Sequence, residues 1–410
     1  MRRRQDEPGT VLVLSQVYPP DPAAVGQYMA DASIRLAAKG TAVRVLAANR
    51  GYEDPSTRYA ARERTAGVQV RRLPLSSSGK TNLAGRLTGQ LSFVVQCVVR
   101  GLLTRDLTAV LCTTSPPFAT AAGLFIGWVR RVPVHYWLMD INPDQALATG
   151  QLRKTSLLVK GLDWLNRQAL RRAATIISLD RYMEDRMRSK VDDPQAAMAI
   201  VPPWPLDSRV RPVDHTDNSF RERHGISGKR VVMYSGNHSP VHPLNTLLAA
   251  ASRLEHREDL VFAFVGGGLE KRRVDDAIAA GARNLLSLPY QPLEEIATSL
   301  AAADIHVVVL GNQMRGIVHP SKVYNAMLVG RPLLYVGPRP SHVTDLMDRH
   351  DIGWEVAHGD VAQAVEALTA IADADTATLQ KLGQRAREAV LGEFDPTLLS
   401  DRLCSLIIGD

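Results

Sequence analysis

The chain has 410 residues, which suggests two domains because a single ordinary core rarely grows so large. Its 45% hydrophobic and 22% charged residues are typical of a folded globular protein and exclude a disordered or fibrous class. The formal net charge of +7 favours anionic partners, either phosphates, acidic lipid head groups or nucleic acid.

The apolar segments and the cysteines indicate the cellular compartment of the protein. The apolar run at 11–14 is too short for a signal peptide. No window of the sequence reaches the roughly 18 uninterrupted apolar residues that a membrane-spanning helix needs. Three cysteines without metal-ligand spacing favour a reducing compartment over a disulfide framework. We therefore expect a cytoplasmic protein.

The first half of the chain alternates short apolar strands with helical patterns. This rhythm predicts a parallel sheet with helices on both faces. Strands are predicted at 11–14, 43–46, 109–112, 134–137 and 175–178, and helices at 27–39 and 118–130.

Residues 83–103 allow two interpretations. Apolar residues recur there at helical spacing, and arginines and glutamines interrupt the run. We favour a helix that packs on the sheet. The alternative is a helix that lies on an acidic membrane surface, which would make the protein peripheral at the inner face of the membrane.

A proline-rich segment at 201–206 separates this half from a second series of the same kind. We therefore predict an α/β protein with two doubly wound Rossmann-like domains, at 1–206 and 207–392, that face each other across a ligand-binding cleft. The second series predicts strands at 231–234, 261–265, 305–309 and 333–336, with helices near 244–254, 271–280, 293–301 and 323–329.

Glycines and polar residues follow two strands of the second domain, where a parallel sheet presents its ligands. Gly236, Asn237 and His242 come after its first strand, and the glycines at 266–268 come after the next. Such glycines let the backbone approach a phosphate or a nucleotide base, although a tight turn would explain them equally well. His238 and His242 lack a third ligand and a common helix, so we reject a metal site.

The densest group of candidates spans residues 315–332. Pro320 at a first helical turn would leave the N–H groups of residues 321–323 free to face an anion. Lys322 adds a positive charge, and the guanidinium of Arg315 could bind phosphate oxygens. Asn325 would lie one helical turn deeper and could pair with hydroxyl groups. The alternative is a capped core helix.

Candidates in the first domain are fewer. Gly26 precedes a predicted helix and could approach a phosphate, or it is a simple turn glycine. Ser115 follows one strand. Asp140 and Asp144 follow another and could orient a hydroxyl or act as acid or base, unless they only cap a helix. The acidic pair at 373–375 sits in an alanine-rich helical segment, so we set it aside as a metal motif.

Several of these stretches, in this order, resemble the retaining glycosyltransferases of family 4, especially the branch that builds bacterial surface polysaccharides and the N-acetylfucosamine transferases. The resemblance implies a GT-B fold and a metal-independent reaction that retains the anomeric configuration. It also implies a nucleotide-sugar donor, with UDP as the expected nucleotide, held mainly by the second domain without any cofactor. The matching stretches are 11–26, 115–117, 139–144, 234–242, 265–268, 320–327 and 330–332.

Cleavage of a sugar–phosphate bond develops negative charge on the leaving diphosphate, which Lys322 and Arg315 would stabilise. The resemblance suggests that the leaving phosphate itself takes the acceptor proton. The catalytic candidates are Lys322, Arg315 and Asp140. The acceptor-side candidates are Ser115, Asp140 and Asp144. The donor-binding candidates are Gly26, Gly236, Asn237, His242, Gly266, Gly268, Tyr290, Pro320, Ser321, Lys322 and Asn325.

The resemblance also implies that the apolar helix predicted at 397–408 crosses back, so that 393–410 completes the first domain. Two positions depart from the family. It usually carries two glutamates eight positions apart, where this chain has Ile317 and Asn325.

That departure leaves a second hypothesis, a non-catalytic nucleotide-sugar-binding protein. A nicotinamide-dependent oxidoreductase would need a G-x-G-x-x-G loop, which neither domain has. Scattered basic residues and 5% aromatics disfavour nucleic acid. The expected partners are thus a nucleotide-sugar donor and a glycan, lipid-linked or small-molecule acceptor.

Overall fold

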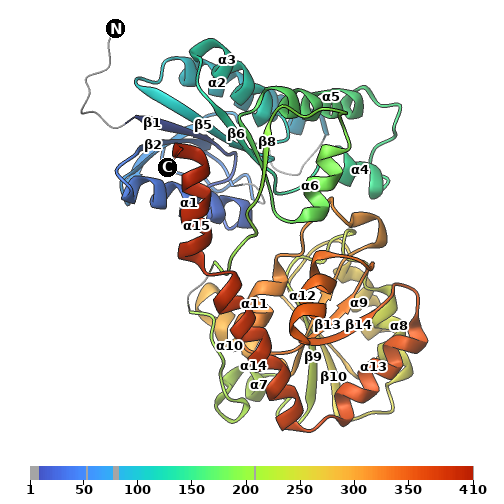
Figure 1. The fold of residues 1–410 in the computed structure, drawn as a ribbon. Helices are drawn as coiled ribbons and strands as arrows, with labels where there is room; N and C mark the ends of the chain where they lie inside the picture. Colours follow the sequence, from blue (N-terminus) through green and yellow to red (C-terminus); the bar gives the residue numbers. More distant parts are fainter. Residues whose placement is uncertain (1–8, 52–53, 77–82, 207–208, 410) are drawn as a thin grey trace. The chain divides into compact units, whose positions relative to one another are not determined.

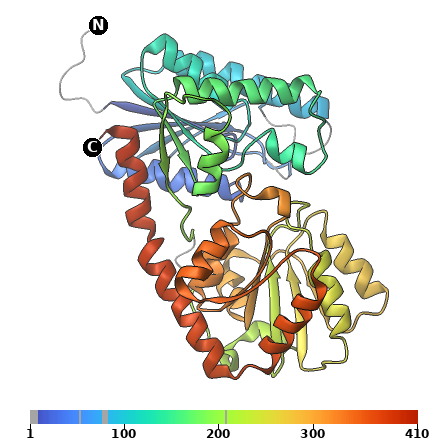
Figure 2. The same ribbon diagram turned by 45° about the vertical axis from the view of Figure 1, so that its right-hand side comes forward.

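The computed structural model describes residues 9–51, 54–76, 83–206 and 209–409. The chain forms two compact units (Figures 1 and 2). The first comprises Met1–Pro203 together with Thr397–Asp410, and the second comprises Trp204–Pro396. The chain thus passes from one unit to the other within the proline-rich segment. Residues 1–8 and 207–208 lie outside the described residues. The predicted N-terminus and the predicted domain boundary at 206–207 fall there.

The first unit contains an eight-stranded sheet in the order β3-β4-β2-β1-β5-β6-β7-β8. All neighbouring strands are parallel except β3 and β4, which pair antiparallel. The order reverses between β1 and β5, because β1 pairs with β2 on one side and β5 on the other. The strands are β1 (Thr10–Leu14), β2 (Ala42–Ala48), β3 (Arg62–Thr65), β4 (Val68–Leu73), β5 (Leu107–Thr113), β6 (Val134–Trp137), β7 (Thr175–Ser178) and β8 (Ala197–Ile200).

The helices of the first unit cover this sheet (Figure 1). The predicted helix at 83–103 is present as α2, which buries Phe93 and Cys97. Helix α3 contacts both α2 and α5. No helix in the described ranges is long and apolar enough to cross a membrane. The helices are α1 (Ala24–Ala38), α2 (Leu83–Leu102), α3 (Ala119–Arg130), α4 (Asp144–Ala148), α5 (Leu157–Arg172), α6 (Arg181–Arg188) and α15 (Pro396–Ile408).

Helix α15 returns to the first unit and packs beside α1. The Asp401 carboxylate accepts a hydrogen bond from Arg35 Nε at 2.7 Å and forms an ion pair with Lys39 at 3.0 Å. These cations hold the pKa of Asp401 below its usual range, with the Arg35 hydrogen bond as the largest cause. The apolar side of α15 contributes Leu403 and Cys404, both completely buried. The last helix is therefore part of the core of the first unit.

The second unit contains a six-stranded parallel sheet in the order β11-β10-β9-β12-β13-β14. The order reverses between β9 and β12. The strands are β9 (Arg230–Ser235), β10 (Leu260–Val265), β11 (Leu285–Leu288), β12 (Ile305–Val309), β13 (Leu333–Val336) and β14 (Gly353–Val356). The helices are η1 (His215–Asp217), α7 (Ser219–Arg223), α8 (Asn245–Arg253), α9 (Lys271–Ala279), η2 (Leu293–Glu295), α10 (Ile296–Ala301), η3 (Asn312–Met314), α11 (Lys322–Leu328), α12 (His342–His350), α13 (Val361–Asp373) and α14 (Thr376–Glu393).

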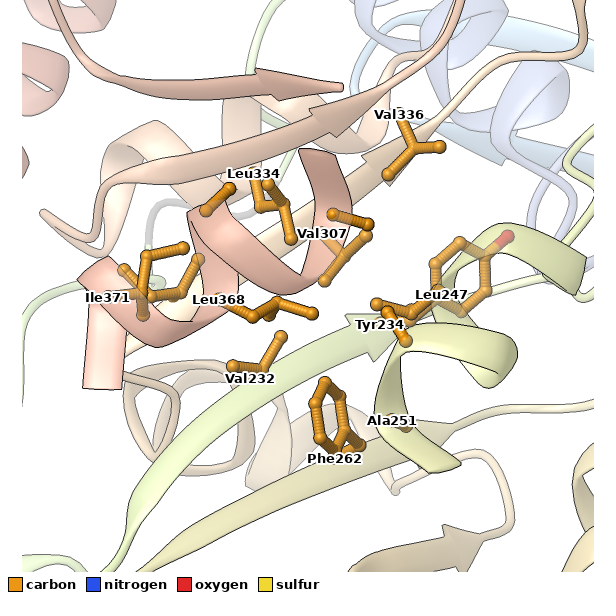
Figure 3. Close-up of a cluster of buried hydrophobic side chains, with 14 of the residues drawn as sticks. Val232, Tyr234, Leu247, Ala251, Phe262, Val307, Leu334, Val336, Leu368 and Ile371 are labelled. Carbon is orange, nitrogen blue, oxygen red and sulfur yellow. The ribbon is translucent and has the colours of Figure 1, made fainter. Parts of the chain in front are cut away.

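One face of this sheet packs against α8 and α13 in a buried apolar cluster (Figure 3). Val232, Phe262 and Val307 come from three neighbouring strands, and Leu368 of α13 lies against them. Tyr234 stands at one end of the cluster, with its hydroxyl oxygen at the margin of the apolar side chains. The sheet thereby holds a phenol at the end of β9, next to the polar loop that follows.

At the opposite end of β9, a buried carboxylate joins the two central strands. Asp304, just before β12, accepts hydrogen bonds from the Val231 N–H at 2.8 Å, from Arg221 at 3.1 Å and from Arg230 at 3.0 Å. Removing a partner from a buried, fully paired carboxylate is costly, so these contacts fix β9 against β12. The carboxyl ends of the two strands are thereby held as neighbours.

We predict that Leu403→Ala destabilises the first unit by about 2–5 kcal/mol, because it removes a fully buried side chain and leaves a cavity. Arg402→Ala, on the exposed side of the same helix, is the matched control and should change stability by less than about 0.5 kcal/mol. Thermal unfolding of the full chain measures both. Equal transitions for the two variants would mean that α15 does not stabilise the first unit.

Candidate functional site

The candidate site lies at the carboxyl ends of β9 and β12, where the strand order of the second unit reverses. Ligands of doubly wound sheets bind at this point because the two following loops diverge to opposite faces. The loop after β9 carries Gly236, Asn237 and His238, and the segment after β12 leads to Lys322 at the start of α11. The fold therefore brings together two of the groups that the sequence singled out.

The side chain of Lys322 passes directly over Gly236. A Cβ atom on Gly236 would lie 2.8 Å from Lys322 Cε, closer than real carbon atoms approach. Gly236 also has a φ of +122°, a conformation that side chains disfavour. The Lys322 amine donates to the Tyr234 hydroxyl and to the Asn237 carbonyl oxygen, the latter at 3.0 Å. A glycine at 236 is thus what lets the lysine reach this position.

The electrostatic state of Lys322 follows from its surroundings. Burial lowers the pKa of its amine to about 7, because a charged ammonium loses hydration there. Its two hydrogen-bond acceptors, the Tyr234 hydroxyl and the Asn237 carbonyl oxygen, are uncharged. A bound anion would favour the charged amine and raise its pKa again. The Lys322 amine can therefore bind an anion, since neither of these two hydrogen-bond acceptors carries a negative charge.

Two histidines support this loop in their neutral forms. His238 Nδ1–H donates to the Gly236 carbonyl oxygen at 2.9 Å, and His242 Nδ1–H donates to the Val309 carbonyl oxygen at 2.6 Å. Burial, with Lys322 and Lys271 nearby, lowers the pKa of His238 to about 4, and burial also holds the pKa of His242 well below its ordinary value. The His238 Nε2 atom is buried and has no hydrogen-bond partner among the described residues. Both rings thus fix backbone carbonyls without adding charge.

The glycines after β10 pack their backbone against the loop after β9. A Cβ atom on Gly266 would lie 2.1 Å from the Gly236 carbonyl oxygen, and one on Gly268 would lie 2.4 Å from that of His238. The predicted donor residue Tyr290 is half exposed, and its hydroxyl donates to the Gly267 carbonyl oxygen at 3.2 Å. The glycines therefore serve close packing of two loops, and Tyr290 covers them.

The start of α11 corrects one prediction. The Ser321 N–H donates to the His319 carbonyl oxygen at 2.9 Å, and the Val323 N–H donates to that of Pro320 at 3.2 Å. Two of the three N–H groups expected to face an anion are therefore used in tight turns. The helix has only seven residues, so its dipole is small as well. Of the groups predicted to face an anion here, the Lys322 side chain is better placed than the backbone amides.

The remaining candidates of this segment differ in exposure. Arg315 is exposed at the end of η3, and Asn325 is half-buried on α11. Ile317, which replaces a glutamate of the family, is 1% exposed and belongs to the core. A residue so deeply buried and apolar contributes no polar contact to a ligand.

In the first unit, Ser115 and Asp140 follow the neighbouring strands β5 and β6, and both are half-buried. The Asp144 carboxylate is occupied, since it accepts from Arg186 at 2.8 Å and from Lys190 at 2.7 Å. These two cations tie the start of α4 to the end of α6. The structure thus gives Asp144 a tethering role, whereas Ser115 and Asp140 remain predicted acceptor-side residues.

Two further predictions change in detail. Gly26 lies in the first turn of α1, which begins at Ala24, and not in a loop before the helix. A Cβ atom there would lie 3.0 Å from the Tyr18 nitrogen, so the glycine lets two backbone segments meet. In the second unit, Asp373 ends α13 and pairs with Arg257, while Asp375 caps α14. The two aspartates flank a helix junction, where a continuous helix was expected.

Comparison with known proteins relates the chain to glycosyltransferases. Residues 23–204 match the model of the glycosyl transferase 4-like domain. The chain is 29% identical over 276 residues to the Pseudomonas aeruginosa protein named as glycosyltransferase WbjE, a match that covers 66% of each chain. It is 26% identical over 336 residues to WcaI of Escherichia coli K12, whose name assigns it to colanic acid biosynthesis, covering 78% of this chain and 81% of WcaI.

The structure of Anabaena HepE in complex with UDP and glucose superposes with a TM-score of 0.68 at 15% identity, over 97% of this chain and 98% of HepE. Residues 23–204 form a glycosyl transferase 4-like domain, and the chain has the GT-B fold. The predicted donor-binding set left out two residues of this candidate site. Tyr234 was predicted only as the end of a strand. His238 was considered as a polar group facing a ligand, with a metal site rejected, but was not among the donor-binding residues.

We predict that Gly236→Ala lowers the stability of the second unit, and that adding Lys322→Ala restores part of the loss. The added methyl group meets Lys322 Cε in the wild-type background but not in the alanine background. A coupling of about 0.5–3 kcal/mol between the two changes is expected for groups in contact. Thermal or urea unfolding of the four proteins measures it, and strictly additive effects would mean that the two side chains do not meet.

Proposed function

We propose that this glycosyltransferase moves a sugar from UDP-sugar to a glycan or lipid-linked acceptor with retention at the anomeric carbon. The proposal rests mainly on Lys322. Its partly buried amine has uncharged hydrogen-bond partners and lies at the point where the strand order of the second unit reverses. It would bind the diphosphate of the donor. The nucleotide would pack against Gly236, Asn237 and the neighbouring glycines at 266–268.

The chemistry follows from charge. Negative charge grows on the leaving diphosphate as the sugar–phosphate bond breaks. A cation held in a desolvated site stabilises that charge by a few kcal/mol, because it needs no reorganisation as the reaction proceeds. Lys322 supplies this cation, and exposed Arg315 adds a second. The leaving phosphate accepts the acceptor proton, so the proposal needs no separate catalytic base.

The choice of donor and acceptor draws on the comparisons. HepE, which shares the fold, was solved with UDP and glucose, and this favours UDP as the nucleotide. WcaI is named for the biosynthesis of a polysaccharide, which favours a glycan or lipid-linked acceptor over a small molecule. Such a reaction would take place in the cytoplasm, where nucleotide sugars are made. We further propose that no metal ion is required, since Lys322 takes over the neutralisation of the diphosphate.

One observation favours the rival hypothesis of a binding protein without catalysis. Ile317 is buried where the family has a glutamate, so one polar contact to the donor is missing. We propose that the half-buried amide of Asn325 makes the remaining contact, to the ribose hydroxyl groups. Enzyme and binder differ in one measurable respect, the release of free nucleoside diphosphate.

We predict that Lys322→Ala lowers UDP release from the productive UDP-sugar by about 100-fold, the usual loss on removing one donor to a developing oxyanion. Lys229→Ala is the matched control, because Lys229 is exposed beside the amino end of β9 and should leave the rate unchanged. The assay uses a panel of UDP-sugars with the lipid fraction of a polysaccharide-producing bacterium as acceptor, with and without EDTA.

The proposal expects sugar transfer that EDTA leaves unchanged, and a product whose anomeric proton coupling matches that of the donor. Tight binding of UDP-sugar without release of UDP in any acceptor would support the binding protein. Full activity of a folded Lys322→Ala variant would contradict the role given to the lysine.

A further inference from the structure

Large apolar side chains are exposed on three adjacent helices of the first unit. Helix α2 presents Leu91, Val95 and Val99 at intervals of four residues, which places them on one face. These side chains are 64%, 53% and 51% exposed. Phe93 and Cys97, between them in sequence, point into the core. The helix is therefore apolar on both sides, and packing on the sheet explains only one of them.

The neighbouring helices continue this surface. Helix α3 contacts α2 and exposes Phe125 and Trp128, and α5 contacts α3 and exposes Leu157 and Trp164. Trp128 is 71% and Trp164 is 61% exposed. The three helices lie together on the same side of the sheet (Figures 1 and 2). Large apolar side chains exposed on three adjoining helices point to an interaction site, since water-facing helices normally carry polar residues.

The charged residues of these three helices are all positive except one. The sequences of α2 and α3 contain no aspartate or glutamate. Helix α5 contains one, Asp163, whose carboxylate is already paired with Lys190 and Arg167. On α5, the exposed cations Lys160 and Arg171 share the face of the exposed apolar residues, because they follow at helical spacing. The surface thus combines tryptophans, aliphatic residues and positive charge.

An open apolar groove adjoins α2. It has a volume of about 480 Å³ and is lined mainly by Leu75, Leu91 and Val95. At its wall, Gln96 donates to the Pro74 carbonyl oxygen at 2.6 Å, which holds the preceding loop against the helix. Such a groove suits a hydrocarbon chain better than a polar ligand, because its lining offers little to hydrogen-bond with.

We infer that the face formed by α2, α3 and α5 binds the surface of an anionic lipid bilayer. Tryptophans and lysines or arginines side by side are characteristic of segments that lie in the interface between lipid head groups and acyl chains. The tryptophans and aliphatic residues enter the interface, and Lys160 and Arg171 contact lipid phosphates. This binding is separate from the reaction proposed above, because every residue of the face belongs to the first unit and Lys322 belongs to the second.

The test is cosedimentation of the full chain with vesicles of phosphatidylcholine, with and without phosphatidylglycerol. Wild-type protein should sediment with the anionic vesicles and be released by salt. Lys160→Gln with Arg171→Gln should weaken binding about thirtyfold, as expected for two surface cations. Arg272→Gln with Lys381→Gln, exposed cations of the second unit, is the matched control and should bind like wild type.

Trp128→Ser with Trp164→Ser should weaken binding by about tenfold or more. UDP binding of each variant, measured in parallel, should stay at the wild-type value. No sedimentation with anionic vesicles, or equal sedimentation of wild type and charge variant, would overturn the inference. So would a dimer in light scattering that the tryptophan variant dissociates, because the face would then belong to a second copy of the chain.

Discussion

The passage of Lys322 over Gly236 is the constraint on which the candidate site depends. Only a residue without a side chain allows the lysine to lie across the end of β9, and only there does its amine reach Tyr234 and Asn237. The buried cluster of the second unit holds Tyr234 in place from below, and Asp304 fixes β9 against β12. The position of the Lys322 amine thus depends on how the core of the second unit packs.

The same arrangement predicts that ligand binding at the site depends on pH. Burial lowers the pKa of Lys322 to about 7, so the charged fraction falls as the pH rises through that value. A bound diphosphate favours the ammonium and raises the pKa, so binding takes up a proton and weakens at higher pH. His238, with a pKa of about 4, is already neutral in this range and does not contribute. Binding of the proposed donor is therefore expected to follow the titration of Lys322.

The sequence predicted two doubly wound domains because short apolar runs mark the buried parallel strands, and the resemblance to a known family added the GT-B fold. It missed β3, whose residues are charged and exposed, although the Gly67 turn after it is a hairpin signal. It expected free amides at 321–323, because tight turns that consume N–H groups leave no local pattern. The pairing of Lys322 with Gly236, and that of Asp144 with Lys190, join residues far apart in the chain. Such contacts appear only once the strand order is known.

The most direct test of the account is the titration of Lys322 itself by NMR. Protein with ¹³Cε-labelled lysine would be titrated alone and with saturating UDP-glucose, and the Lys322→Arg variant would assign the resonance. The account predicts a pKa near 7 for the free protein and a clearly higher pKa with the sugar nucleotide bound. A Lys322 that titrates at the ordinary value of a lysine in both states would contradict it.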